Sequence, residues 1–131
     1  MKRFIFLAFL VCGAMASLTE KQQQNMDSIH TMCVSEIGVS EDVIDKARSG
    51  DFVQDAKLKC YMKCYFDKIG VMSGDGKVDI DIALATLPDN LQYAAPVIKK
   101  CGSQAGADVC DVVFNTLKCH YDEDKTAYFL P

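Results

Sequence analysis

The sequence predicts an all-α fold, and three observations carry that prediction. Apolar residues recur with helical spacing along most of the chain, between residues that typically start and stop helices. No run alternates apolar and polar residues as a half-buried strand does. Six of the seven cysteines lie beyond the N-terminal apolar run, and an even number of cysteines is typical of a small disulfide-bonded domain.

The N-terminus has the pattern of a secretory signal peptide. Residues 1–3 are Met-Lys-Arg, residues 4–12 are an apolar run too short to span a bilayer, and residues 14–16 read Ala-Met-Ala, a small-residue cleavage pattern. The sequence therefore predicts a signal peptide at residues 1–16 and a single secreted, extracellular domain at residues 17–131. A short N-terminal membrane anchor is the alternative.

Removal of the signal peptide changes both the charge and the cysteine count. Lys2 and Arg3 leave with it, so 12 basic residues remain against 18 acidic residues, a net charge of -6. That balance argues against nucleic acid and anionic membrane surfaces as partners, and no second long apolar run predicts stable membrane insertion. Cys12 also leaves. The six cysteines that remain are Cys33, Cys60, Cys64, Cys101, Cys110 and Cys119.

The first half of the predicted domain contains three helix patterns. Ser17 and Glu20 have the spacing of a capping box and start the first helix. Each of the three patterns ends at a glycine, the residue that most easily adopts the left-handed conformation after a helix. Their ranges, from the capping residue to the glycine, are 17–38, 40–50 and 55–70.

The second half contains three more helix patterns. Asp79 and Asp81 favour the positive end of the fourth helix, and Pro88 closes it. Pro96 lies inside the fifth pattern and is expected to kink or delay that helix, because proline lacks the backbone donor. The predicted ranges are 78 or 79 to 87, 90–100 and 107–121.

Two segments with metal-like composition lack the necessary ligands. Residues 73–81, SGDGKVDID, resemble half of a calcium-binding loop, but Val71 and Ile82 stand where that loop needs carboxylates. A structural zinc site needs close pairs of ligands at both ends, and here only Cys60 and Cys64 are close. We therefore expect no metal and no cofactor.

Cys60 and Cys64 lie on one face of the third predicted helix, one turn apart. Adjacent turns of one helix rarely offer disulfide geometry, and the pair differs from the C-x-x-C motif of redox proteins. The two cysteines are therefore interpreted as anchors for two different segments. Six cysteines allow fifteen pairings, and spacing alone leaves the choice open.

The cysteine spacings carry a resemblance to a known family. Between successive cysteines there are 26, 3, 36, 8 and 8 residues. With the signal peptide and the helical pattern, this order resembles the insect odorant-binding proteins, the pheromone and general odorant-binding family. The resemblance implies the bridges Cys33–Cys64, Cys60–Cys110 and Cys101–Cys119, and a six-helix fold around an apolar cavity.

The resemblance also implies which residues line the cavity. A wall for a small apolar ligand is expected to be mostly aliphatic and aromatic. The candidate ligand-binding residues on the last three helices are Ile80, Ala83, Leu84, Leu87, Leu91, Ala94, Ala95, Val97, Phe114, Leu117 and His120. Ordinary core packing is the alternative for each of them.

The C-terminal tail adds three candidates, Tyr128, Phe129 and Leu130. The tail is similar to that of family members whose C-terminus covers the pocket, so we expect these residues to cover the ligand, with the Tyr128 backbone or hydroxyl bonding it. A frayed tail is the alternative. By analogy with relatives, protonation of His120 or of the carboxylates at residues 122–124 would loosen the tail in acid. His30 is expected to face solvent.

The function implied is that of an extracellular carrier for an odorant, pheromone or lipid-like molecule, and not an enzyme. The histidines lack the adjacent aspartate that a phospholipase A2 requires, and no catalytic triad stands out. Two alternatives stay open: a non-olfactory carrier of a hormone or lipid, and a saposin-like membrane-active protein. Homodimerisation and contact with a receptor also stay open.

Overall fold

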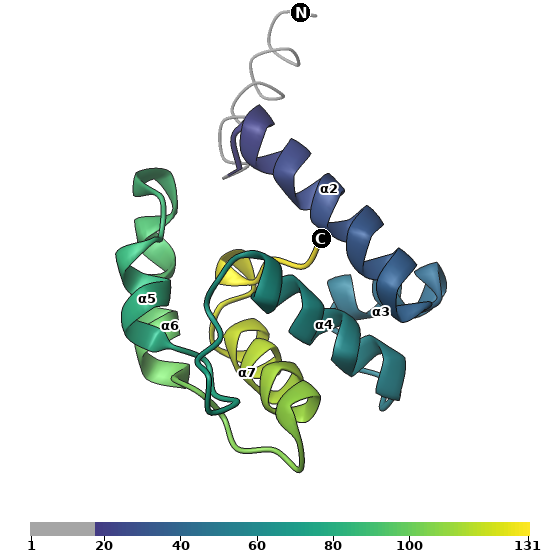
Figure 1. The fold of residues 1–131 in the computed structure, drawn as a ribbon. Helices are drawn as coiled ribbons and strands as arrows, with labels where there is room; N and C mark the ends of the chain where they lie inside the picture. Colours follow the sequence, from purple (N-terminus) through teal and green to yellow (C-terminus); the bar gives the residue numbers. More distant parts are fainter. Residues whose placement is uncertain (1–17) are drawn as a thin grey trace, which may run out of the picture.

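The computed structural model describes residues 18–131, so the predicted signal peptide lies outside the described residues. Within that part the chain forms six α-helices, two short 3₁₀ helices and no strand, which confirms the all-α fold (Figure 1). In chain order the elements are α2 (Glu20–Ile37), α3 (Glu41–Arg48), α4 (Ala56–Lys68), α5 (Ile80–Ala85), η1 (Asp89–Ala94), α6 (Ala95–Cys101), α7 (Val109–Glu123) and η2 (Lys125–Ala127). None of these helices is apolar enough over a sufficient length to cross a membrane.

The start of α2 corrects one detail of the sequence analysis. Thr19 is the capping residue: its hydroxyl accepts from the Gln22 backbone N–H at 3.1 Å, and the Gln22 side chain accepts from the Thr19 N–H at 3.0 Å. The capping box is therefore Thr19 with Gln22 and not Ser17 with Glu20. The same spacing rule selects both pairs, since glutamine serves as well as glutamate in this motif. Gly38 ends the helix with a φ of 74°.

The second half follows the prediction with shifted boundaries. Asp79 caps α5 by accepting from the Ile82 N–H at 3.1 Å. The predicted helix at 90–100 is divided into η1 and α6, and Pro96 lies in the first turn of α6, where no backbone donor is required. α7 begins two residues later than predicted because Asp108 caps it, accepting from the Asp111 N–H at 2.9 Å.

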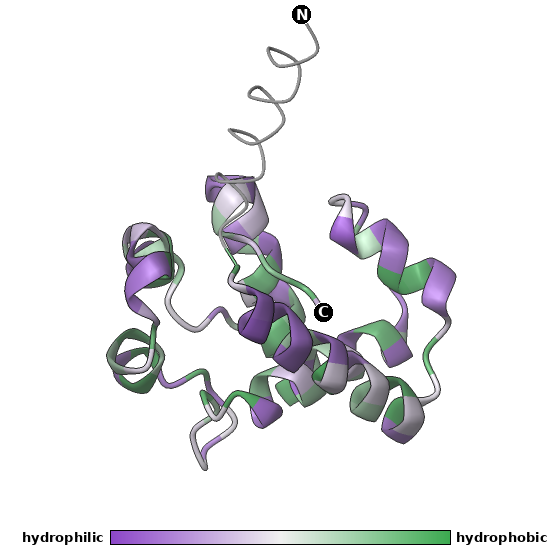
Figure 2. Cartoon of the chain, turned by 90° about the horizontal axis from the view of Figure 1, so that it is seen from above, coloured by the Kyte–Doolittle hydropathy of each residue, from purple (hydrophilic) through white to green (hydrophobic). Residues whose placement is uncertain are grey.

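The core lies where α4 packs against α7 and α2. α4 has the most extensive contacts with α7 and, after that, with α2. Fully buried side chains from α4 include Leu58, Tyr61 and Met62, and α7 contributes Val113 and Phe114. Figure 2 shows that each helix carries both hydrophilic and hydrophobic segments, as amphipathic helices do. α5 and α6 lie together to one side of this core (Figure 1).

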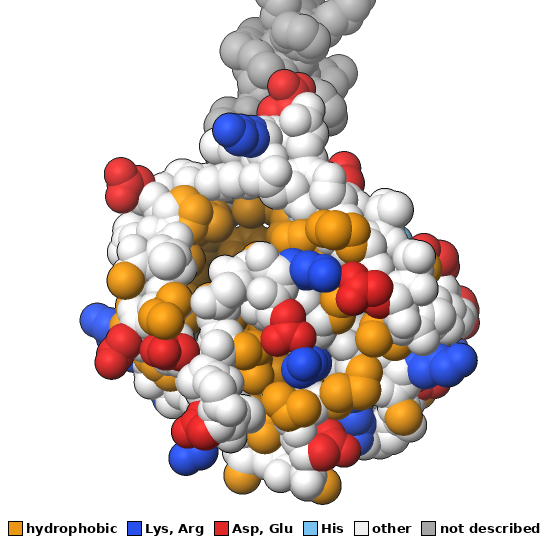
Figure 3. Space-filling model, in the orientation of Figure 1, with side chains coloured by type: hydrophobic (Ala, Val, Ile, Leu, Met, Phe, Trp, Pro, Cys, Tyr) orange, Lys and Arg blue, Asp and Glu red, His pale blue; other side chains and the backbone are white. Residues whose placement is uncertain are grey.

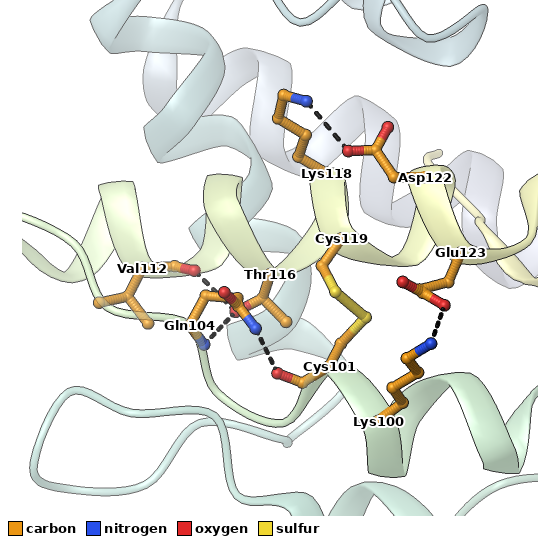
Figure 4. The surroundings of a disulfide bond; sticks show 9 residues. All are labelled: Lys100, Cys101, Gln104, Val112, Thr116, Lys118, Cys119, Asp122 and Glu123. Atoms are coloured by element: carbon orange, nitrogen blue, oxygen red, sulfur yellow. Dashed lines mark hydrogen bonds and ion pairs between the residues drawn. A yellow bond between two sulfur atoms is a disulfide. The ribbon is translucent and has the colours of Figure 1, made fainter.

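The three disulfides have the predicted pairing, with Cys33 bonded to Cys64, Cys60 to Cys110 and Cys101 to Cys119. α4 is thus tied to both α2 and α7 through its two cysteines. Figure 4 shows the third bridge, which joins α6 to α7. Beside it, the Gln104 backbone N–H donates to the buried Thr116 hydroxyl at 3.0 Å, which orders the loop between the two helices.

Candidate functional site

A cavity of about 310 Å³ lies between the α2–α4–α7 core and the layer formed by α5, η1 and α6. That volume is at the lower end for small-molecule sites. Figure 3 shows a hollow surrounded by hydrophobic side chains between these two parts of the molecule. The amphipathic helices turn their apolar faces toward the inside of the molecule, and those faces therefore form the wall of the cavity.

The wall is predominantly apolar. Of its 22 residues, only Gln22, Asn25, Tyr65, Thr86 and His120 carry a polar side-chain group. The apolar wall residues are Leu18, Met26, Ile29, Phe66, Ile69, Val71, Val78, Ile80, Ala83, Leu87, Pro88, Leu91, Ala94, Ile98, Leu117, Ala127 and Phe129. Such a surface favours an apolar ligand through burial of its surface and offers few hydrogen bonds.

Eight of the fourteen candidates from the sequence lie in this wall. They are Ile80, Ala83, Leu87, Leu91, Ala94, Leu117, His120 and Phe129. Ile80 and Ala83 are neighbours on one face of α5 that is turned to the cavity, and Leu87 joins the wall just after that helix ends. Ligand contact by these residues stays a prediction.

The other six candidates lie elsewhere. They are Leu84, Ala95, Val97, Phe114, Tyr128 and Leu130. Phe114 packs edge-on against Phe52 with ring centres 5.6 Å apart, so it belongs to the core. Val97 and Ala95 are replaced in the wall by Ile98 and Ala94. Each missed candidate is one position from a wall residue, and side chains one position apart on a helix point in different directions.

Several wall residues were missed because their pattern also fits ordinary core. Met26 and Ile29 belong to the apolar stripe of α2, and Tyr65 and Phe66 belong to the broad apolar face of α4. The sequence shows that such a face is buried. It carries no signal that separates packing against a neighbour from facing a cavity.

The C-terminal tail is folded against the molecule. Asp124 caps η2, its carboxylate accepting from the Thr126 N–H and hydroxyl at 3.0 and 2.7 Å, and these bonds lower the pKa of Asp124. The Tyr93 hydroxyl donates to the Thr126 carbonyl at 3.1 Å, which links η1 to η2. Ala127 and Phe129 then complete the cavity wall.

Tyr128 points away from the apolar cavity. Its hydroxyl donates to the Ala47 carbonyl at 2.7 Å, so the hydroxyl predicted to bond the ligand has a partner within the protein. Its ring packs against Phe52 and Tyr121, with ring centres 5.6 and 5.2 Å away. Tyr128 thereby anchors the tail to the α3 side of the core.

The end of the tail is held by a second anchor, here called the tail clasp and formed by His30, Tyr61 and Pro131. The Tyr61 hydroxyl donates to the Pro131 carbonyl, and His30 Nδ1 lies 2.8 Å from the same hydroxyl. His30 Nε2 bonds the Glu41 carboxylate at 2.9 Å. The expectation that His30 faces solvent was wrong, because these two bonds hold it half-buried between α2, α3 and α4.

His120 lies in the cavity wall near the end of α7. Its Nε2 atom is buried and has no hydrogen-bond partner in the described part of the chain. Burial lowers the pKa of His120 to about 4, since an imidazolium would lose its hydration there. The ring is therefore neutral at physiological pH.

A second, more polar cavity of about 550 Å³ lies on the other side of the tail, beside the tail clasp. It shares Leu18, Met26 and Phe129 with the apolar cavity, so the two cavities are neighbours. Within residues 18–131, no group of three or more histidine, cysteine, aspartate or glutamate side chains could hold a metal ion.

Comparison with known proteins places this geometry among insect proteins. Residues 15–123 match the model of the PBP/GOBP family. General odorant-binding protein 99a of Drosophila melanogaster is 34% identical over 95% of this chain and 92% of its own length. General odorant-binding protein 69a of the same fly is 31% identical, but the match covers 67% of this chain and 61% of that relative.

Solved structures agree with the sequence relatives. The medfly odorant-binding protein CcapOBP22/CcapOBP69a is similar with a TM-score of 0.67 and 32% identity, over 75% of this chain and 86% of that one. The fatty acid binding protein OBP56a from the oral disk of the blowfly Phormia regina is similar with a TM-score of 0.62 and 32% identity, over 81% and 96%. The chain therefore belongs to the PBP/GOBP family of insect odorant-binding proteins.

Proposed function

We propose that the protein is a carrier that holds a small hydrophobic molecule in the apolar cavity. The observation that carries this proposal is the cavity itself, about 310 Å³ of space inside a small domain whose walls are almost entirely apolar. A void of this kind forfeits packing contacts and is costly to keep. A ligand that fills it recovers those contacts and stabilises the closed fold.

The relatives support a hydrophobic ligand. The blowfly protein is named for fatty acid binding, and the fly relatives are named for odorant binding. We propose an odorant, pheromone or lipid-like molecule for this chain, with no catalytic step. Carriage of such a molecule in a fluid other than that of an olfactory organ fits the same cavity.

We further propose that the protein acts outside the cell after removal of residues 1–16. Three disulfides support an oxidising compartment, where such bonds form and persist. The cavity is lined by helices and the tail of this one chain, and this favours a carrier over a saposin-like protein that opens onto a membrane.

Release is proposed to follow opening of the tail. Tyr128 and the tail clasp hold the tail where Phe129 closes the wall. Acid would favour opening through His120, because the closed fold keeps that ring neutral down to a pKa of about 4. Any open state that hydrates His120 gains stability relative to the closed state as the pH falls from about 6.5 to 4, by up to about 1.4 kcal/mol per pH unit.

The proposal is tested by titrating the purified protein, with its disulfides formed, with an apolar fluorescent probe at pH 7 and pH 4.5. Saturable binding that small apolar molecules displace is expected at pH 7, with weaker binding at pH 4.5. The sequence contains no tryptophan, so an external probe is needed. Absence of displaceable binding at pH 7 would contradict the carrier function, and lysis of lipid vesicles by the same protein would favour the saposin-like alternative.

The tail is tested with Tyr61→Phe, which removes the hydroxyl that bonds Pro131. The probe is expected to dissociate about three- to tenfold faster, in line with the loss of about 1 kcal/mol for one hydrogen bond. Tyr93→Phe is not a suitable control because Tyr93 also holds the tail. Tyr121→Phe is the suitable control, since the Tyr121 hydroxyl donates to the Ser49 carbonyl and not to the tail.

A further inference from the structure

One hydroxyl group in the molecule lacks the partner that its counterparts have. The chain has five tyrosines, and four of them donate to a backbone carbonyl. The pairs are Tyr61 with Pro131, Tyr93 with Thr126, Tyr121 with Ser49 and Tyr128 with Ala47. The Tyr65 hydroxyl makes no hydrogen bond within residues 18–131, although the residue is only 6% exposed. Buried tyrosine hydroxyls normally find a partner, so this exception needs a cause.

Tyr65 lies in the wall of the apolar cavity. It follows Cys64, whose disulfide fixes this turn of α4 to α2, and its ring packs edge-on against Phe66 with ring centres 5.3 Å apart. The position of the ring is therefore set by the core. Burial raises the pKa of Tyr65, so the hydroxyl keeps its proton and can both donate and accept.

Each of the other polar side chains in the wall is hydrogen-bonded within the protein, exposed to solvent, or enclosed by protein atoms. The Gln22 amide exchanges hydrogen bonds with Asn90, at 3.0 Å in each direction. The Thr86 hydroxyl donates to the Ile82 carbonyl at 2.8 Å.

Two polar wall residues remain besides Tyr65. Asn25 is exposed, so it belongs to the rim of the cavity. The Nε2 atom of His120 is enclosed by protein atoms. Tyr65 is thus the buried wall residue whose hydroxyl has no hydrogen-bond partner within residues 18–131 and remains open to the cavity.

We propose that the Tyr65 hydroxyl is the hydrogen-bonding partner of the ligand, and that the preferred ligand is a neutral, mainly apolar molecule with one oxygen function: an alcohol, aldehyde, ketone or ester. This inference rests on the proposed carrier function and specifies its ligand class. The cavity has the volume of about ten water molecules, which sets the scale of the molecule.

The charge of the wall argues for a neutral oxygen over a carboxylate. No lysine or arginine is among the described wall residues. A carboxylate buried here would lose its hydration without gaining a cation, and that loss is far larger than the gain from one tyrosine hydrogen bond. A hydrocarbon would leave Tyr65 unpaired.

The test compares four competitors of equal chain length for displacement of an apolar probe: a ten-carbon alkane, alcohol, aldehyde and carboxylate. Each is titrated at pH 7 against the disulfide-bonded protein, Tyr65→Phe and the control Tyr121→Phe. The first variant removes only the wall hydroxyl, and the second removes a hydroxyl that bonds Ser49. Every protein is measured against the same stock solutions. The different aqueous solubilities of the competitors then cancel when the affinity of one competitor is compared between the variants.

We expect Tyr65→Phe to weaken the alcohol and the aldehyde about three- to tenfold while leaving the alkane and the probe unchanged. Tyr121→Phe is expected to leave all ratios unchanged. Equal effects of Tyr65→Phe on all competitors, or none on the alcohol and aldehyde, would overturn the inference and leave the carrier function standing. Failure of every competitor to displace the probe from the unmodified protein would overturn the carrier function itself.

A measurement on the unmodified protein covers the case in which Tyr65→Phe does not fold. The carbonyl stretching band of the bound aldehyde is recorded by infrared spectroscopy. A hydrogen bond to Tyr65 is expected to shift that band to lower frequency relative to the aldehyde in an alkane solvent. A band at the alkane position would contradict the inference.

Discussion

The two sides of the cavity are built on different principles. The side formed by α2, α4 and α7 holds most of the buried residues, and the bridges at Cys60 and Cys64 tie α4 to both of the other helices. On the opposite side, α5 has no buried residue, and η1 and α6 contribute only Leu91, Ala94 and Cys101. One bridge, Cys101–Cys119, ties that layer to α7.

The difference shows how a small domain can keep a cavity. The dense side, formed by α2, α4 and α7, supplies most of the stability, because its apolar side chains are buried away from water and packed against one another. The thin side has few buried residues, so it has little packing energy of its own and depends on the covalent tie. The predictions below separate the contributions of the two sides.

The largest expected effect comes from the bridges. Replacing Cys60 and Cys110 together by serine opens a link between residues 50 apart in sequence and is expected to cost about 4 kcal/mol of unfolding free energy. Replacing Cys101 and Cys119, 18 apart, is expected to cost about 3 kcal/mol and to abolish probe binding while the α2–α4–α7 helices persist. Urea unfolding followed by circular dichroism, with probe titration, measures both. Normal probe binding by the second variant would show that packing alone holds the thin wall.

The next effect concerns His120, on the dense side but facing the cavity. Its folded pKa, about 4, lies below the ordinary 6.5, so the folded state binds fewer protons than the unfolded state as the pH falls between these values. Its contribution to stability is complete at pH 7, is lost as the pH falls from 6.5 to 4, and amounts to about 3 kcal/mol.

His120→Leu is expected to reduce the loss of unfolding free energy between pH 7 and pH 4 by that amount. Asp111 and Asp124, whose hydrogen bonds lower the pKa of both carboxyls, add to the acid loss in either protein and cancel in the comparison. An equal pH dependence for the two proteins would mean that the His120 ring is hydrated in the folded state.

The smallest expected effect compares two neighbours on the thin side. Ala94 lies in the cavity wall and is 2% exposed, whereas Ala95 lies outside the wall. Ala94→Leu places three additional carbon atoms at the cavity and is expected to weaken the probe at least tenfold at little cost in stability, since the void receives them. Ala95→Leu is the matched control and is expected to change affinity less than twofold. Similar losses for both variants would place the ligand outside this cavity.

The sequence predicted the features that depend on nearby residues and missed those that depend on residues far away along the chain. The helices, their glycine stops and the aspartate caps were predictable because each depends on residues within a few positions of one another. The candidates Ile80 and Ala83 lie on one face of α5, and that face could be identified from their spacing. Phe114 and Tyr128 could not be placed, because their partners Phe52 and Ala47 lie far away along the chain.

The sequence by itself determined the class of fold, the cysteine framework and, through its resemblance, the family to which the chain belongs. The tertiary structure decided which apolar faces meet a void, that His30 joins Tyr61 in the tail clasp, and that the Tyr65 hydroxyl alone among the tyrosine hydroxyls has no hydrogen-bond partner within residues 18–131. The physical reason is that a buried face has the same pattern whether it packs against a side chain or a cavity. Hydrogen-bond partners across the fold become defined only when distant segments meet.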